Sequence, residues 1–408
     1  MRVLKNISIL YTCTANGGQG DISPVKNASV AWEDGRIKWV GSEKDLPKKY
    51  SEAQFFDAEG KIVIPGLVDC HTHLCFGGWR EDEFEMRLQG KSYLEIAKAG
   101  GGILSTVKAT RKATEEELYV KASGLLEKII QQGVTTIECK SGYGLSLDDE
   151  LKQLRVYKKL REKSSAEIVS TFLGAHTFPP EYKDDRKGYI NLIINEMIPR
   201  VAEESLADFC DIFVEESAFT IDEAKKILLN GKEYGLRPKL HADQLSSGRG
   251  AELAAEVGAV SADHLEQISD RGIQRMAEEG VVGVTLPLAS LYTQQPYLNC
   301  RRLVDGGVDV AVATDFNPGS APSYQLPLAM MLTCNHGRLT PAEALKGATV
   351  YAAKAIGMDH KVGSVEAGKK ADFVVLDAPS VNFWMYHFGG NIIRQIFVAG
   401  ELLHRSSV

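Results

Sequence analysis

Eight short segments rich in β-branched residues, separated by segments of helical character, constrain the fold of this chain more than any other feature. The eight are GLVDCHTH (66–73), VTTIECKS (134–141), EIVSTFLGAH (167–176), DFCDIFVEE (208–216), LRPKLHAD (236–243), VSADHL (260–265), GVVGVTLP (280–287) and DVAVATDF (309–316). The segments between them, such as 115–133 and 222–235, have apolar residues at helical spacing and end at glycine. Eight alternating β/α units predict an α/β fold, a TIM-like (β/α)₈ barrel.

The two ends of the chain predict a second, smaller domain built of β-strands. Asp34-Gly35 lies between two alternating segments, which is a strong hairpin signal, and Glu59-Gly60 repeats it. Two further segments near the C-terminus, GKKADFVVLD (368–377) and IIRQIFVAGELLHR (392–405), are again strand-like, and the second contains a turn at Ala399-Gly400. Neither end is long enough for a large core of its own, so we expect them to form one small β-sandwich together. The expected domain boundaries are 1–65 with 356–408 for the sandwich and 66–355 for the barrel.

Composition and charge exclude several classes of protein. Hydrophobic residues make up 44% of the 408 residues and charged residues 25%, which is typical of soluble globular domains. The net charge of −7 and the lack of a Lys/Arg cluster argue against nucleic-acid binding. No apolar run approaches the ~20 residues of a membrane span. The seven cysteines are scattered and form no CxxC pair, so we expect reduced thiols in a cytoplasmic protein.

Five of the nine histidines lie at the ends of predicted barrel strands, where barrel enzymes carry their chemistry. They are His71, His73, His176, His241 and His264. His71 and His73 are two residues apart, so we expect both side chains to point into the barrel. Two imidazoles on one face of a strand end suit a metal ion. A pair of buried, hydrogen-bonded histidines explains an isolated pattern of this kind equally well.

Two further strand ends complete a candidate metal site. His241 ends the fifth β-rich segment, and Asp315 ends the eighth, where an apolar strand enters the turn-rich sequence NPGS. An Asp at a strand end often only forms a turn. Together with His71 and His73, however, these residues supply three imidazole nitrogens and one carboxylate, which suit zinc or iron and leave a position for water. His264 ends the sixth segment, from which it could hydrogen-bond that water.

Several longer motifs resemble the metal-dependent amidohydrolase superfamily. They are IPGLVDCHTH, HADQL, SADHL and TDFNPG, with VGSVEAGKKADFVVLD in the predicted sandwich. HTHLCFGGWRE, KSGYGL and FLGAHTFPPEY add a more specific likeness, to the branch of the superfamily that opens an imidazolone ring in histidine degradation. The resemblance extends over essentially the whole chain. It implies hydrolysis of the ring amide C–N bond of 4-imidazolone-5-propanoate to N-formimidoyl-L-glutamate.

The resemblance also implies the parts of a site. It gives one zinc or iron ion to His71, His73, His241 and Asp315, and it suggests a homodimer. The substrate contacts that it implies are Arg80, Tyr143, His176, Gln244, Asn317, Gly319 and Ser320. The chemistry agrees with these roles, because Arg80 offers a planar, bidentate partner for a carboxylate tail. NPGS is expected to bring backbone N–H groups close to a ligand.

Lys140 ends the second β-rich segment. Some amidohydrolases bridge two metal ions with a carboxylated lysine, but that lysine belongs to the fourth strand, where this chain has Glu215 and Glu216. We therefore expect a single metal ion, with Lys140 in a structural role or at the polar rim of the barrel.

The expected reaction uses a water molecule that the metal activates. Asp315, helped by His264, is expected to take the proton of this water, and the resulting hydroxide attacks the ring carbonyl. Gln244 stands where members of the family can carry Glu. An amide cannot shuttle a proton, but it can donate to a ring carbonyl and accept from a ring N–H, so we interpret Gln244 as a residue that orients the substrate.

Two alternatives to this function remain. One is a nucleobase deaminase of the same superfamily, although such enzymes typically use an HxxE glutamate that HADQ lacks. The other is a non-catalytic amidohydrolase-like scaffold, although such proteins lose metal ligands, and all four are present in this sequence.

Overall fold

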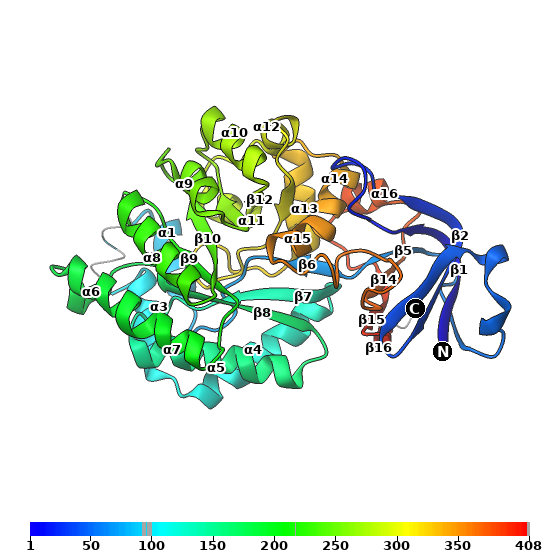
Figure 1. The fold of residues 1–408 in the computed structure, drawn as a ribbon, viewed down its shortest axis with the longest axis horizontal. Coiled ribbons are helices and arrows are strands. Elements are labelled where there is room, and N and C mark those ends of the chain that lie inside the picture. Colours follow the sequence, from blue (N-terminus) through cyan, green and yellow to red (C-terminus); the bar gives the residue numbers. More distant parts are fainter. Residues whose placement is uncertain (92–94, 96–99, 217, 406–408) are drawn as a thin grey trace.

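The computed structural model describes residues 1–91, 95, 100–216 and 218–405. Figure 1 shows a large body of strands and helices beside a small β body, and the small body carries both ends of the chain. Within these described ranges, no helix is long and apolar enough to cross a membrane.

Eight parallel strands form the wall of the large body. They are β6 (Leu67–Asp69), β7 (Val134–Lys140), β8 (Glu167–Ala175), β9 (Phe209–Ile212), β10 (Arg237–Ala242), β11 (Ser261–His264), β12 (Val282–Thr285) and β13 (Val310–Val312). Each strand pairs with the next one in sequence. A parallel bridge between Thr72 and Phe316 joins the two outermost strands just beyond their ends. The predicted barrel and all eight of its strands are confirmed.

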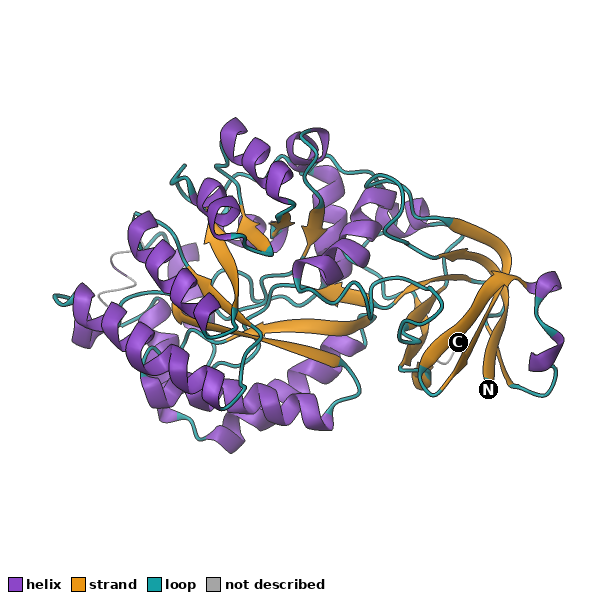
Figure 2. Cartoon of the chain, in the orientation of Figure 1, coloured by secondary structure: helices purple, strands orange, loops and turns teal. Residues whose placement is uncertain are grey.

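Helices cover the outside of the barrel, as Figure 2 shows. They are α1 (Glu81–Leu88), α3 (Ile103–Lys112), α4 (Glu115–Ile130), α5 (Leu147–Lys163), α6 (Arg186–Leu192), α7 (Ile198–Glu203), α8 (Ile221–Glu233), α9 (Gly250–Val257), α10 (Asp270–Glu279), α11 (Pro287–Thr293), α12 (Cys300–Asp305), α13 (Leu326–Asn335), α14 (Pro341–Gly347) and α15 (Val350–Ala355). Thr114 and Thr220 begin α4 and α8 with capping boxes, in which the threonine and the glutamate three residues later satisfy free backbone N–H groups.

The small body is one sheet that bends back on itself. Its strands are β1 (Arg2–Tyr11), β2 (Pro24–Glu33), β3 (Arg36–Ser42), β4 (Gln54–Asp57), β5 (Ile62–Pro65), β14 (Phe373–Leu376), β15 (Ile393–Val398) and β16 (Glu401–Arg405), with the helix α16 (Val381–Tyr386) between β14 and β15. Their order is β16-β15-β14-β5-β1-β2-β3, with β4 beside β1. The ring of Trp32 on β2 lies 5.2 Å from that of Phe373 and 5.7 Å from that of Phe397. The predicted sandwich of both chain ends is confirmed, and its two layers are halves of one sheet.

One of the two predicted N-terminal hairpins is correct and the other is wrong. Asp34 and Gly35 both have positive φ, 51° and 70°, and join the antiparallel strands β2 and β3. Strands β4 and β5, on either side of Glu59-Gly60, instead lie parallel to β1 at residues 2–5 and 9–10. The turn has the positive φ that its sequence predicts, but the longer strand β1 decides the pairing.

The two bodies are joined by more than the chain. Glu167, at the start of β8, pairs with Lys361 at 2.7 Å and with Lys370 at 3.2 Å, both of which lie in the segment between α15 and β14.

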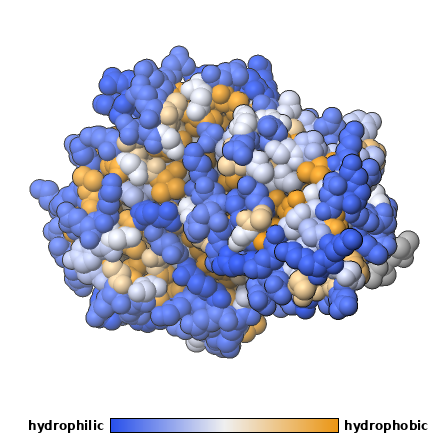
Figure 3. Space-filling model, turned by 45° about the vertical axis from the view of Figure 1, so that its right-hand side comes forward, coloured by the Kyte–Doolittle hydropathy of each residue, from blue (hydrophilic) through white to orange (hydrophobic). Residues whose placement is uncertain are grey.

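The surface in the view of Figure 3 is mostly hydrophilic, with apolar side chains grouped in a few places. We propose that the domains divide at 1–65 with 356–408 and at 66–355.

Candidate active site

A cavity of about 440 Å³ lies at the carboxyl ends of the barrel strands. Its lining includes eleven of the twelve predicted site residues, namely His73, Arg80, Tyr143, His176, His241, Gln244, His264, Asp315, Asn317, Gly319 and Ser320. The twelfth, His71, is fully buried beside them, with its ring 5.4 Å from that of His73. The fold therefore brings all the predicted residues to one place.

Asp315 and two histidines have the spacing of metal ligands. Nε2 of His71 lies 3.4 Å and Nε2 of His73 lies 3.5 Å from Oδ1 of Asp315. A tetrahedral ion with bonds of ~2.0–2.1 Å separates its ligand atoms by about 3.4 Å. These three residues could therefore hold one ion between them.

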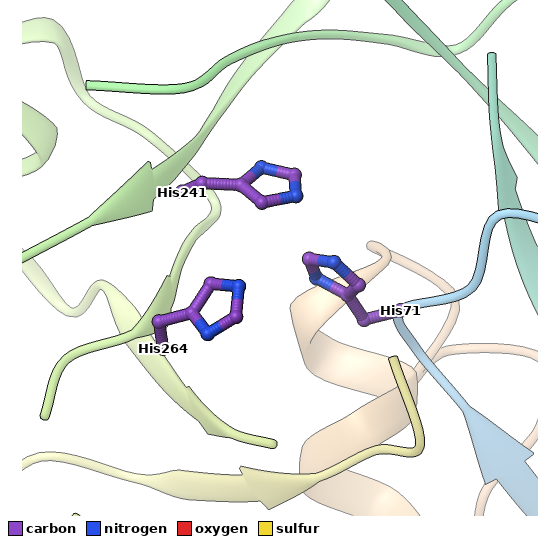
Figure 4. Close-up of side chains that lie close together, drawn as sticks. All are labelled: His71, His241 and His264. Atoms are coloured by element: carbon purple, nitrogen blue, oxygen red, sulfur yellow. The ribbon is translucent and has the colours of Figure 1, made fainter. Parts of the chain in front are cut away.

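His241 and His264 approach the same point from two neighbouring strands. Figure 4 shows the rings of His71, His241 and His264 turned toward one another, and these residues offer ligand atoms that lie within 4.8 Å of one another. The ring of His71 lies 4.6 Å from that of His241 and 5.8 Å from that of His264. Four imidazoles and one carboxylate thus surround the cavity floor.

Two buried carboxylates fix the tautomers of two of these histidines. Nδ1 of His71 lies 2.6 Å from Oδ2 of Asp263, and Nδ1 of His241 lies 3.1 Å from Oδ2 of Asp211. Each ring donates its Nδ1–H to a carboxylate, which leaves a lone pair on Nε2. Both Nε2 atoms are buried and have no hydrogen-bond partner among the described residues. A carboxylate behind each ring is the usual support of a metal-binding histidine, so these residues fit a metal ion.

The charge states of the site agree with that fit. Burial lowers the pKa of His241 to about 3 and also lowers the pKa of His73, so both rings are neutral at pH 7. Burial opposes a charge on His71 as well, but Asp263 and Asp315 outweigh it and raise the pKa of His71. Burial opposes the charge of Asp315, but its close contacts with His71 and His73 outweigh burial and hold the pKa of this carboxyl well below its usual value. Asp263 and Asp315 favour a positive charge on His71. A metal ion bound between the histidines and Asp315 would supply that positive charge in place of a proton.

A cluster of five buried charged side chains lies behind the histidines. Lys140 pairs with Glu138 at 2.9 Å, with Asp211 at 2.8 Å and with Asp263 at 3.4 Å. Lys239 lies 3.5 Å from Glu138. All five side chains are inaccessible to solvent. The structural role expected for Lys140 is therefore supported and the polar-rim alternative is wrong, because this lysine is held inside the barrel by carboxylates of three other residues.

The backbone is unusual at the two residues with expected catalytic roles. His264 has φ of 79° and Asp315 has φ of 55°, in the left-handed region that such residues seldom adopt. Strained conformations of this kind cluster at functional sites. Nδ1 of His264 lies 3.7 Å from Oε2 of Glu266, which can orient the ring.

The residues expected to contact the substrate line the same cavity as the histidines. The ring of His176 stacks on that of His73 at 5.3 Å, and its Nδ1 lies 3.0 Å from the carbonyl oxygen of Gly142. Tyr143 is buried, and burial raises the pKa of its hydroxyl, which therefore stays protonated and able to donate. Gln244 lines the cavity beyond His241.

The backbone N–H groups of NPGS are not turned toward the cavity, contrary to expectation. Gly319 and Ser320 both donate their N–H to Oδ1 of Asn317, at 2.8 and 2.7 Å. Nδ2 of Asn317 donates to the carbonyl oxygen of Asp315 at 2.6 Å. The amide of Asn317 thus builds the loop, because Asn readily bonds to the backbone two residues on. The side-chain hydroxyl of Ser320 remains close to Asp315, at 3.5 Å.

Three partners behind the site are not among the residues that the sequence predicts for it. Asp211 and Asp263 orient the histidines, and Glu83 pairs with Arg80 at 2.8 Å. Asp211 carries one signal in the sequence, because it stands among the apolar residues of β9, where a buried charge is costly unless it is paired. Asp263 carries no such signal, because its strand β11 also holds Ser261 and His264.

Comparison with known proteins agrees with this barrel and its histidine site. Residues 62–403 match the model of the amidohydrolase family, and the chain belongs to that family. It is 51% identical over 387 residues to the imidazolonepropionase of Geobacillus thermodenitrificans, which covers 94% of this chain and 91% of that protein. It is 45% identical over 412 residues to the imidazolonepropionase of Clostridium tetani, which covers 99% and 98%. Within the family the chain belongs with the imidazolonepropionases, hydrolases that act on the C–N bond of a cyclic amide.

Solved structures share the fold at lower identity. An adenosine deaminase from Xanthomonas campestris with bound zinc has a TM-score of 0.70 at 17% identity, covering 98% of this chain and 92% of that chain. Atrazine chlorohydrolase from Arthrobacter aurescens, complexed with zinc, has a TM-score of 0.73 at 14% identity, covering 99% and 95%. At these identities the likeness concerns the fold alone.

Proposed function

We propose that this site opens the ring of 4-imidazolone-5-propanoate and releases N-formimidoyl-L-glutamate. One observation carries the proposal. Nε2 of His71 and Nε2 of His241 are buried and accept no hydrogen bond from the described residues, while a carboxylate fixes Nδ1 of each ring. This arrangement suits a metal-assisted hydrolysis, the class of reaction to which ring-amide cleavage belongs.

In this proposal one Zn²⁺ or iron ion is held by His71, His73, His241 and Asp315. When bound, the ion supplies a Lewis acid that polarises the ring carbonyl and lowers the pKa of water. Both metals accept a shell of imidazoles and a carboxylate, so the donor set alone does not choose between them.

The proton transfers are assigned to Asp315, and the stabilisation of the developing negative charge is assigned to His264. Asp315 accepts a proton from the attacking water as the new C–O bond forms. His264 donates a hydrogen bond to the ring oxygen as it gains negative charge, which stabilises the tetrahedral state. Asp315 then returns the proton to the leaving ring nitrogen, and the C–N bond breaks.

The remaining residues bind and orient the substrate. Arg80 takes the carboxylate tail, and Tyr143 and His176 hold the ring in place. The amide of Gln244 donates to one polar ring atom and accepts from another. Asn317, Gly319 and Ser320 shape the wall of the cavity, with the hydroxyl of Ser320 close to Asp315.

A side-by-side activity assay tests this assignment of substrate. We expect ring opening of imidazolone propanoate and no ammonia release from guanine or cytosine, since HADQ lacks the glutamate that deaminases typically use. Ammonia release from a base, without ring opening, would make the chain a deaminase instead. Neither activity, together with no stoichiometric zinc or iron in the purified chain, would favour a scaffold. We also propose, from the family resemblance, a cytoplasmic homodimer, and sedimentation of the purified chain tests its assembly.

A further inference from the structure

We propose that Glu83 is a positioning residue that decides which edge of the Arg80 guanidinium is offered to the carboxylate of the substrate. The inference rests on the proposed function, in which Arg80 binds the propanoate tail. Glu83 lines the same cavity as Arg80, and its positioning role makes a prediction of its own about selectivity for a carboxylate.

Arg80 and Glu83 form a bidentate salt bridge with two hydrogen bonds. Nε of Arg80 donates to Oε1 of Glu83 at 3.0 Å, and Nη2 donates to Oε2 at 2.8 Å. A guanidinium has five N–H groups in one plane. The pair with Glu83 occupies the edge formed by Nε and Nη2, so the edge formed by Nη1 and Nη2 is left for another partner.

Glu83 is itself held in place by two further donors. Its Oε1 accepts from the backbone N–H of Gly102 at 2.8 Å and from Oγ of Ser105 at 3.2 Å. Burial opposes its charge, but Arg80 and these donors outweigh burial and lower the pKa of the carboxyl. Glu83 is therefore an ionised, anchored group at neutral pH and not a side chain free to swing.

The opposite side of the guanidinium lies against the loop that follows β13. A Cβ atom added at Gly319 would lie 2.2 Å from Nη1 of Arg80, so a larger residue there would have to displace the guanidinium from this position. Arg80 and Gly319 both line the cavity. Glu83 on one side and the Gly319 backbone on the other thus fix the plane of the guanidinium at the cavity wall.

In a competing interpretation, Glu83 competes with the substrate, because its carboxylate binds Arg80 until the carboxylate of the substrate displaces it. Displacement would break the two bonds to Arg80 and leave the buried N–H of Gly102 without its acceptor, whereas Oγ of Ser105 also lies 2.9 Å from the carbonyl oxygen of Gly102. A buried donor left without a partner is costly, so the anchored geometry favours positioning. The two interpretations predict opposite changes in substrate binding when the charge of Glu83 is removed.

The test is Glu83→Gln, with Glu85→Gln on the same helix as the matched control, because Glu85 is exposed. We expect KM for imidazolone propanoate to rise roughly tenfold with kcat changed by less than about twofold, as for the loss of one charge-assisted contact. Competitive inhibition by 3-(imidazol-4-yl)propanoate and by its primary amide gives a second readout. The preference for the acid over the amide should fall in Glu83→Gln and persist in Glu85→Gln.

Each other outcome has a distinct meaning. A lower KM in Glu83→Gln would show that Glu83 competes with the substrate for Arg80. An unchanged KM with an unchanged preference for the acid would show that Glu83 has no part in substrate recognition. Either result overturns the inference. If Glu83→Gln fails to fold, Gly319→Ala replaces it, because the added methyl displaces Nη1 from the other side and should produce the same loss of preference. Failure of the proposed function is separate, since the unmodified chain would then not open the ring at all.

Discussion

At the scale of single residues, the chemistry of this site depends on which ring nitrogen of each histidine is free. Asp263 and Asp211 take the Nδ1–H of His71 and His241, so Nε2 faces the cavity in both. Nδ1 of His73 has no such carboxylate among the described residues, and Nε2 of His73, like that of His71, lies near Asp315. The HxH pair alone left a buried structural pair open, and the carboxylates behind the rings now favour metal binding.

His264→Ala tests the division of work between metal binding and catalysis. We expect kcat to fall by ~10²–10⁴, the usual contribution of a positioned proton donor, while the metal content stays near that of the unmodified chain. Steady-state kinetics and metal analysis of the same sample check this. His336→Ala is the control, because that exposed ring stacks on Tyr297 away from the cavity. Near-normal turnover of His264→Ala would remove this residue from the mechanism.

At the scale of elements, the barrel strands carry charge where a barrel interior is usually apolar. Glu138 and Lys140 come from β7, Asp211 from β9, Lys239 from β10 and Asp263 from β11. Lys140 bridges the two aspartates that orient His71 and His241. The cluster therefore joins four of the barrel strands, and through Asp263 and Asp211 it supports the rings of His71 and His241.

Lys140→Met should destabilise the barrel strongly. Removing one partner from a buried ion cluster leaves carboxylates unpaired, which costs about 3–5 kcal/mol in free energy of unfolding. Chemical denaturation measures this loss, and metal affinity should fall with it because Asp211 and Asp263 are no longer held. Lys128→Met, at an exposed position of α4, is the control. An unchanged denaturation midpoint for Lys140→Met would show that the cluster does not support the barrel.

The sequence predicted the site better than its surroundings, for a physical reason. Carboxyl ends of parallel strands meet at one rim, so His71, His241 and Asp315 could be grouped without knowing any contact. The buried partners Asp211 and Asp263 lie on strands whose stagger relative to their neighbours cannot be derived from the sequence. The turn at Glu59-Gly60 shows the same limit, because its local conformation was predictable while the pairing partner, β1, was not.

At the scale of the whole molecule, both chain ends fold into one sheet that packs beside the barrel. Glu167 at the start of β8 connects the two bodies through Lys361 and Lys370. Burial opposes the charge of Glu167, but the two lysines outweigh it and lower the pKa of this carboxyl from its usual 4.5. The sequence predicted the union of the ends from strand patterns, but it gave no indication of this contact.

Glu167→Gln tests that connection through its dependence on pH. A carboxyl whose pKa is lowered by folding stabilises the fold above the pKa of the unfolded chain, and this contribution disappears as pH falls through the folded value. We therefore expect the variant to lose about 1 kcal/mol at pH 7 and to lose less at pH 3, which lies below the pKa of the carboxyl in the unfolded chain. Denaturation at both pH values measures it, with the exposed Glu162→Gln as control. An equal loss at both pH values would contradict the assigned role of the charge.

The measurement that bears most directly on the account is the ring-opening rate of one purified sample followed through metal removal and reconstitution. We expect about one zinc or iron ion per chain, loss of ring opening in step with the loss of the ion on chelation, and recovery when zinc or iron is returned. Ring opening at an undiminished rate in a sample stripped of metal would contradict the assignment of His71, His73, His241 and Asp315.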